Sequence, residues 1–143
     1  MDSFREGVVL KAFEEMVTWA KKMNLFHSET IFGMSMDDPE VTPKEKYRYE
    51  VCITIPLKFK MESDSSIETT TLPKCQYAVT AVSGDFNLVV AATNFLFDHW
   101  LINSLYESES QYGLEVFLDK ENICNWNHFD LELYIPVKAL KNY

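Results

Sequence analysis

The sequence is poor in cysteine and in basic residues, and each shortage excludes a class of protein. Its three cysteines, Cys52, Cys75 and Cys124, are widely spaced and form no C-x-x-C pair. This pattern argues against a disulfide framework and against a zinc site. Lys and Arg number 13 against 22 Asp and Glu, which gives a formal net charge of −9. A phosphate backbone is repelled by such a chain, so we expect no direct binding to nucleic acid.

Long apolar runs and cofactor motifs are missing as well. No apolar run reaches the length of about 18 residues that crosses a bilayer, and the first residues form no hydrophobic signal segment. We therefore expect no membrane contact and a cytoplasmic location. The sequence has neither a Gly-rich phosphate loop nor a G-x-S-x-G elbow. His27, His99 and His128 have no partner at ligand spacing, so we expect no metal and no cofactor.

An internal repeat is the strongest positive signal in this chain of 143 residues. Trp19 and Trp100 are 81 positions apart, and Pro56 and Pro136, which each end an apolar alternating run, are 80 apart. One offset that holds across a helix and a strand indicates a duplicated unit with pseudo-twofold symmetry. The chain is predicted to be one domain, with a first module at 1–60, a linker at 61–74 and a second module at 75–143.

Hydrophobic periodicity assigns the elements of each module. In the second module, Asp85 is predicted to cap a helix that carries Leu88, Ala92, Phe95, His99 and Ile102 on one face. Strand-like runs and the helix of the first module are assigned in the same way. The predicted strands are 31–37, 47–55, 76–82, 113–119 and 129–137, and the predicted first helix is 4–23.

The second module thus reads strand-helix-strand-strand, whereas the first begins directly with its helix. We expect an α+β fold, in which an antiparallel sheet carries two helices on one face and a groove lies between the modules. The first strand of module one is absent from the chain. The open edge that results is expected to be covered by a homodimer partner, or by residues that precede the assigned start codon.

Strand alternation suggests where a ligand would bind. In the last two strands of each module, one face is apolar and is expected to pack on the helices. The other face mixes aromatic rings, methionines and carboxylates, which suits a flat or cationic apolar molecule. Trp126 lies in a loop, where it forms either a rim over the groove or a plug against the strands. The candidate ligand-binding residues are Glu115, Phe32, Met34, Glu50, Phe117, Glu132, Tyr134 and Trp126.

Three segments together resemble a known family. The run D-D-P-E-V-T-P-K-E-K-Y-R-Y-E at 37–50, G-L-E-V-F-L-D at 113–119 and F-D-L-E-L-Y-I-P-V at 129–137 are similar to GyrI-like small-molecule-binding domains. That group includes effector-binding domains of AraC-type and MerR-type multidrug regulators and DNA gyrase inhibitors. The resemblance implies two modules with a ligand groove between them, and it places the family's pocket acid on Glu115 and another acidic position on Glu50.

The resemblance leaves three functions open. The layout is that of a stand-alone sensor without a helix-turn-helix segment, which would bind a small hydrophobic, cationic or planar molecule. The chain would alternatively be a hydrolase of electrophilic genotoxins, in which Glu115 acts as base with Tyr134 or Glu132. A third reading is a protein-binding role, with gyrase or a regulator as the partner. Binding is preferred over catalysis, and no residue is assigned as catalytic on the sequence alone.

Overall fold

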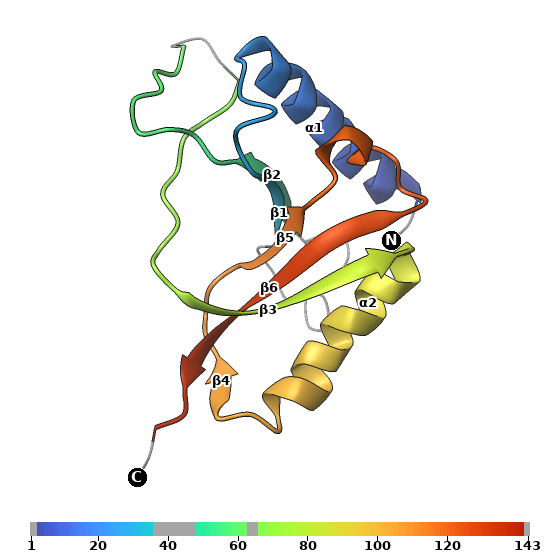
Figure 1. Ribbon diagram of the computed structural model, residues 1–143, viewed down its shortest axis with the longest axis vertical. Coiled ribbons are helices and arrows are strands. Elements are labelled where there is room, and N and C mark those ends of the chain that lie inside the picture. The colour runs from blue at the N-terminus through green and yellow to red at the C-terminus, as the bar shows by residue number, and fades with distance from the viewer. Residues whose placement is uncertain (1–2, 36–47, 63–65, 142–143) are drawn as a thin grey trace.

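The computed structural model describes residues 3–35, 48–62 and 66–141, with backbone only for 3–6. The helix α1 is followed by two strands, and the second half contributes four strands and the helix α2, which continues into a π-helical turn (Figure 1). The π-helical turn is η2, and a short 3-10 helix, η3, lies between β5 and β6. The elements are α1 Ser3–Lys22, β1 Ile31–Ser35, β2 Tyr49–Ile53, β3 Gln76–Gly84, α2 Phe86–Phe95, η2 Leu96–Leu101, β4 Tyr106–Ser108, β5 Gly113–Phe117, η3 Lys120–Asn122 and β6 Phe129–Ala139.

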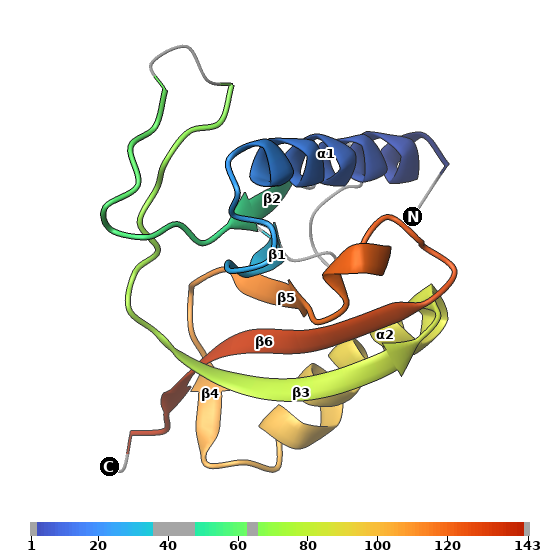
Figure 2. The same cartoon turned by 45° about the horizontal axis from the view of Figure 1, so that its top comes forward.

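All strand pairings are antiparallel, and the sheet order is β2-β1-β5-β6-β3, with β4 pairing to the end of β6. The β1–β2 pair corresponds to the β5–β6 pair, and β1 and β5 lie side by side at the centre. Figure 2 shows the long, curved β3 running beside β6 at the outer border of the sheet. The fold class predicted from the repeat is therefore confirmed.

The helices form where the sequence periodicity places them. In α1, Phe13, Met16 and Ala20 are buried and share the inward face, as spacings of three and four residues require. In α2, the Asp85 carboxylate accepts a hydrogen bond of 3.0 Å from the Leu88 N–H, so the predicted N-cap is confirmed. The helix α1 packs against β2, whereas α2 packs against β3 and β6.

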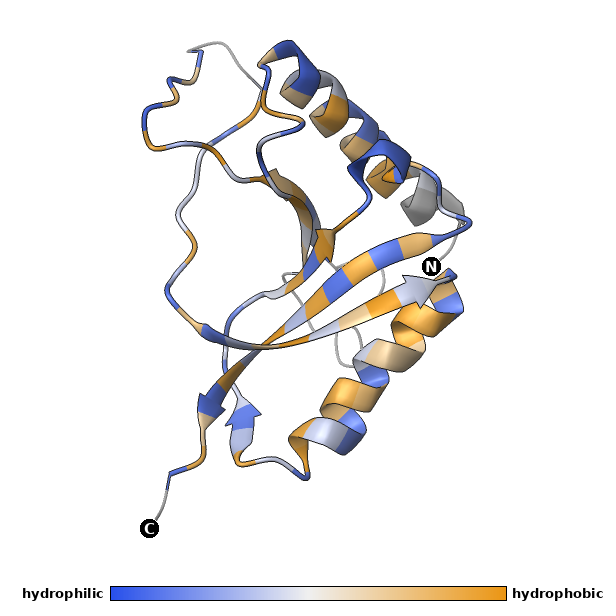
Figure 3. Ribbon diagram, in the orientation of Figure 1, coloured by the Kyte–Doolittle hydropathy of each residue, from blue (hydrophilic) through white to orange (hydrophobic). Residues whose placement is uncertain are grey.

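One prediction for α2 is wrong. The face that was assigned to Leu88, Phe95 and Ile102 is turned to solvent, since these side chains are 46%, 54% and 73% exposed. The buried positions are Val89 and Leu96 instead. The α2 sequence is apolar almost all round (Figure 3), so periodicity alone could not distinguish the inward face from the outward one.

Other differences concern the ends of elements. The strand β4 was not predicted, because three residues carry too little alternation to be recognised. The strand β6 continues past Pro136 to Ala139, where it pairs with β4. The loop predicted at 37–46 lies outside the described residues.

The core lies between the sheet and the two helices. Ile31, Leu131, Leu133 and Ile135 form its floor and are at most 4% exposed. At about 25 cal/mol per Å² of buried apolar surface, such residues supply most of the drive to fold. This floor defines the helix-facing side of the sheet.

Candidate functional site

Strand register determines which predicted site residues share a face. Glu115 on β5 lies opposite Leu133 of β6, and Phe117 lies opposite Leu131. Cross-strand partners project to the same side of a sheet, so Glu115 and Phe117 face the helices. The prediction that they lie on the outer face is wrong. It failed because the carboxylate was assumed to turn away from the core, and Leu114 and Val116 can occupy the outer face equally well.

The remaining strand candidates lie on the opposite side. Phe32 pairs with Val116 and Met34 with Leu114, whereas Glu132 and Tyr134 lie opposite Val116 and Leu114. Glu50 pairs with Met34 and is exposed. Phe32 and Met34 are buried, at 8% and 2% exposure. The eight predicted residues therefore do not form one groove, and only Glu115, Phe117 and Trp126 occupy the helix-facing side.

A cavity of about 50 Å³ lies between the two helices and the sheet. The ring of Phe13 is central to it, since its centroid lies 4.8 Å from that of Phe117, in an edge-to-face arrangement. The same centroid is 6.3 Å from those of Tyr49 and Trp126. The cavity is lined by Val9, Phe13, Tyr49, Phe86, Val89, Glu115, Phe117, Trp126, Phe129 and Leu131.

Among the described residues that line the cavity, Glu115 is the only one with a carboxylate side chain. Its removal from water raises its pKa above the ordinary value of 4.5, and a hydrogen bond with Tyr49 lowers it by a smaller amount. Burial destabilises the ionised form, whereas the Tyr49 hydroxyl stabilises it by donating to the carboxylate. Glu115 is partly buried, and a carboxylate with a shifted pKa inside a cavity is typical of functional sites.

The Tyr49 hydroxyl reaches Glu115 because β1 has no side chain at residue 33. A Cβ built on Gly33 would lie 1.6 Å from Tyr49 Oη and 2.2 Å from Cζ, so the Tyr49 ring would have to shift. Gly33 also lies directly opposite Glu115 in the β1–β5 pair. Tyr49 belongs to the strand face that was expected to pack on the helices, and it was missed as a site residue. Gly33 was the available signal, since a glycine inside a strand marks a close approach.

Trp126 forms one wall of the same cavity. Its ring centroid lies 5.9 Å from that of Phe129, and its indole Nε1–H is buried without a hydrogen-bond partner among the described residues. A buried donor without an acceptor costs about 1–3 kcal/mol. The group would recover this cost by donating to an acceptor on a bound molecule.

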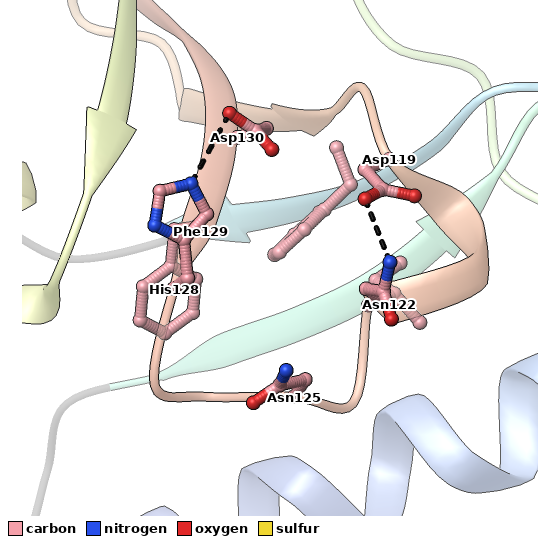
Figure 4. Close-up of a pocket in the computed structure, with 8 residues that line it drawn as sticks. Asp119, Asn122, Asn125, His128, Phe129 and Asp130 are labelled. Carbon is pink, nitrogen blue, oxygen red and sulfur yellow. Dashed lines mark hydrogen bonds and ion pairs between the residues drawn. The ribbon is translucent and has the colours of Figure 1, made fainter.

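A second cavity, of about 140 Å³, opens at the ends of β5 and β6 and shares Phe117 and Phe129 with the first. Figure 4 shows its polar rim, in which Asn122 Nδ2 donates to Asp119 Oδ2 over 2.8 Å. On the opposite side, His128 Nε2 lies 3.6 Å from Asp130 Oδ1. The lining residues are Phe117, Asp119, Asn122, Ile123, Asn125, His128, Phe129 and Asp130.

Ser83, His128 and Asp130 meet at this rim without forming a catalytic triad. The Ser83 hydroxyl donates to Asp130 Oδ1 at 2.6 Å and lies 3.1 Å from His128 Nε2. Since the serine and the aspartate both approach the same ring nitrogen, the imidazole cannot accept a proton from one while the other orients its second nitrogen. Nucleophilic catalysis by Ser83 therefore has no geometric support.

Two further features bear on the class of protein. Within residues 3–35, 48–62 and 66–141, no group of three or more His, Cys, Asp or Glu side chains is arranged to hold a metal ion. No helix in the described part of the chain has the length and apolar composition needed to span a membrane.

Comparison with known proteins identifies the family of this chain. Residues 3–138 match the model of the GyrI-like small molecule binding domain. The chain belongs to this family. The match covers both helices, all six strands and the cavity around Glu115.

Relatives of this GyrI-like chain extend over most of its length. A DNA gyrase inhibitor of Escherichia coli is 29% identical over 137 residues, which covers 93% of this chain and 83% of the relative. The DNA gyrase inhibitor of Escherichia fergusonii is 30% identical over 142 residues, with 92% and 84% covered. A prophage-derived protein of Bacillus subtilis, whose name proposes a role in transcriptional regulation, is 35% identical over 66 residues, 46% of this chain and 43% of its own.

Proposed function

We propose that this GyrI-like domain is a binding protein for a planar or cationic hydrophobic small molecule, held between α1, α2 and the sheet. One observation carries the proposal: Glu115 is a single carboxylate, with a pKa raised by burial, in a cavity lined by aromatic rings. Ring faces attract both flat molecules and cations, and each cation–π contact contributes about 0.5–2 kcal/mol. Glu115 supplies the opposite charge.

The pKa of Glu115 explains why a cation would be favoured. Burial destabilises the ionised carboxylate in the empty cavity, and a cation bound beside it would restore the lost stabilisation. The Trp126 indole N–H adds a donor for an acceptor atom on the same ligand. A ligand with a positive charge, a flat apolar body and one acceptor would therefore match all the polar groups of the cavity.

The cavity has to enlarge before it accepts such a ligand. Its volume of about 50 Å³ is below the range of about 300–1,000 Å³ that is usual for small-molecule sites. Phe86, at the start of α2, is 40% exposed, and Trp126 comes from a loop. These two side chains can move without disturbing a buried strand, so we assign the entrance to them.

The test is a titration of a panel of lipophilic cations and neutral planar compounds against three proteins. These are the wild type, Glu115→Gln and Glu132→Gln. Glu132 lies on the neighbouring strand and on the opposite face, which makes it the matched control. We expect Glu115→Gln to weaken cation binding by about 10–100-fold, the effect of losing a charged partner, and Glu132→Gln to leave the dissociation constant within about twofold. Equal cation affinity in all three proteins would contradict the role of Glu115.

The pH dependence separates the two ligand classes. Above the raised pKa of Glu115 the carboxylate is ionised, so the affinity for a cation rises with pH and levels off beyond that pKa. A neutral ligand that accepts a hydrogen bond from the protonated carboxyl shows the reverse trend. A pH-independent affinity for every compound would remove Glu115 from the binding site.

Hydrolysis of an electrophile is a second candidate, favoured by the hydrogen bond between Tyr49 and Glu115. Glu115 would take a proton from water as the water oxygen bonds to the electrophilic carbon and the strained ring bond breaks. The Tyr49 hydroxyl would give its proton to the leaving atom. Tyr134 and Glu132 cannot share this role, because they lie on the other face. Product formation that stops in Glu115→Gln would establish catalysis, whereas saturable binding without product would reject it.

A role at DNA gyrase is a third candidate, which rests on the names of the relatives. A supercoiling assay with purified gyrase tests it directly. Inhibition by the wild type, undiminished in Glu115→Gln, would indicate that protein contacts act independently of the ligand cavity. No inhibition at a large molar excess would reject this candidate.

A further inference from the structure

The outer strand β3 has the features of a strand that pairs with another chain. It pairs with β6 along all nine of its residues, and no strand in the described part of the chain pairs with its other edge. The sequence Q-Y-A-V-T-A-V-S-G contains no charged residue and no proline. Natural edge strands usually carry such residues, because an unprotected edge recruits further strands.

A flank of α2 extends this uncharged surface. Phe86 lines the cavity together with residues of α1, so its flank faces α1. At 100° per residue, Leu88 and Phe95 lie about 160° and 180° from Phe86 around the helix, and therefore face away from α1. Leu88 also packs on Gly84, the last residue of β3. The surface formed by β3, Leu88 and Phe95 is called the β3–α2 surface below.

The exposures of these side chains are unusually high for apolar residues. On the helix side, Leu88 and Phe95 are 46% and 54% exposed, and beyond the π-helical turn Ile102 and Leu105 are 73% and 81% exposed. On the opposite side of β3, Val79 is 45% exposed. Exposed apolar side chains on both sides of an unprotected strand edge are typical of an interaction site.

The opposite border of the sheet differs. The strand β2 has five residues, Tyr49–Ile53, and carries Glu50. A shorter edge with a charged side chain is protected in the way that natural sheets protect their borders. The sequence led us to expect a homodimer through this border of module one, but the composition of the two strands favours the border of module two.

We propose that two copies of this chain associate through the β3–α2 surface, so that their β3 strands pair antiparallel across a twofold axis. An antiparallel pair of identical strands is self-complementary, as a twofold interface requires. The two sheets would then form one continuous sheet. The flanks of the two α2 helices would cover one side of the junction.

The absence of charge on β3 permits a second copy as the occupant, and the self-complementarity of an antiparallel strand pair favours it. Each chain has a net charge of −9, so two copies repel one another over most of their surface. The strand β3 contributes no charge to this repulsion. A basic or acidic partner would gain nothing from such a surface, whereas an identical uncharged surface matches it.

The size of the surface is sufficient for association. Nine strand residues span about 30 Å, and a strand edge with a helix beside it is about 20 Å deep. Taken as flat, a strip of these dimensions has an area of about 600 Å² per copy. Interfaces of standard size bury about 800 Å² per partner. We therefore expect a dimer that forms in the micromolar range.

Sedimentation equilibrium on the full chain tests the proposal. We expect the wild type to show twice the monomer mass of 16.7 kDa at concentrations above about 10 µM, with tighter association as salt screens the like charges. Phe95→Glu and Val79→Lys each place a charge in the interface and should weaken association at least about 30-fold. Val8→Lys is the matched control, since Val8 is 56% exposed on α1 outside the surface, and it should associate like the wild type.

Three results would overturn the proposal. The first is a wild-type monomer up to about 0.5 mM, a concentration at which even weak specific dimers form. The second is a dimer that persists in both Phe95→Glu and Val79→Lys, with circular dichroism showing folded protein. The third is a dimer that is lost instead in Cys52→Lys, which would place the interface at the β2 border. Monomeric Phe95→Glu and Val79→Lys proteins with a native spectrum would support it.

Discussion

Two carboxylates on neighbouring strands, Glu115 and Glu132, lie on opposite sides of the same sheet and in different surroundings. Glu115 on β5 faces the helices, where rings surround it and burial raises its pKa. Glu132 on the adjacent strand β6 lies opposite Val116 and projects to the other side. Val116, which lies opposite Glu132, directly follows Glu115 in the sequence. Successive residues of a strand point to opposite faces, so the two carboxylates lie on different sides of the sheet. This contrast shows that a carboxylate inside an apolar face, rather than one among the polar residues, is the group to examine for a site.

The largest expected effect comes from closing the space beside Glu115. Gly33→Ala places a methyl group where the Tyr49 ring lies, so we expect the free energy of unfolding to fall by about 2–3 kcal/mol through overpacking. Urea denaturation measures it. Gly113→Ala is the control, because its new Cβ would lie 3.6 Å from Tyr134 O, an ordinary van der Waals contact, and its effect should stay within about 1 kcal/mol. Equal losses in both variants would show that Gly33 has no special role.

A smaller effect distinguishes two equally buried phenylalanines. Phe117 faces the cavity and Phe32 faces the other side, and both are 8% exposed. Replacement of either by leucine should lower stability by about 1–1.5 kcal/mol. Only Phe117→Leu should also weaken the binding of planar compounds, which calorimetric titration would measure. Weaker binding in Phe32→Leu of the same size would contradict the assignment of the cavity.

The titration of Glu115 should be visible in stability as well. Its pKa is raised in the folded protein, so the folded state holds a proton that the unfolded state has released. The contribution of Glu115 therefore becomes unfavourable as the pH rises from about 4.5 through the folded pKa. Glu115→Gln should raise the melting temperature relative to the wild type at pH 8, and the difference should diminish at pH 4. A constant difference across this range would mean that Glu115 does not titrate in the folded protein.

The smallest effect concerns the unpaired indole of Trp126. Trp126→Phe removes a buried donor that has no acceptor in the described part of the chain, so the free energy of unfolding should change by less than about 1 kcal/mol. Ligands that carry an acceptor should bind about fivefold more weakly, since one neutral hydrogen bond contributes about 1 kcal/mol. Ligands without an acceptor should bind equally well to both proteins. A uniform loss for both ligand classes would mean that the indole acts by its area alone.

The architecture was predictable because the duplication encodes it. The matching positions of Trp19 and Trp100, and of the strands that end near Pro56 and Pro136, were enough to predict paired strands with a helix in each module. The family pattern directed attention to Glu115. Both signals come from the spacing of residues that are close in the sequence, and hydrophobic periodicity identifies helices and strands from such spacing.

The face of the site was not predictable in the same way. On β5 both alternate sets contain apolar residues, Leu114 with Val116 and Glu115 with Phe117, so alternation fits two orientations. Only the register of β5 against Leu131 and Leu133 determines which is correct. The helix α2 posed the same difficulty, because residues on three of its sides are apolar. Tertiary pairing decided both cases.

The rings of Phe117 and Phe129 divide the small cavity from the larger polar one, and each ring contacts both. A drug-sized ligand that enters past Phe86 and Trp126 can fill both cavities only if the two dividing rings move, so a slow structural step would follow entry and precede tight contact. Its observed on-rate would then level off at high ligand concentration instead of increasing without limit. Substitution of Phe117 or Phe129 would therefore change ligand binding in both cavities.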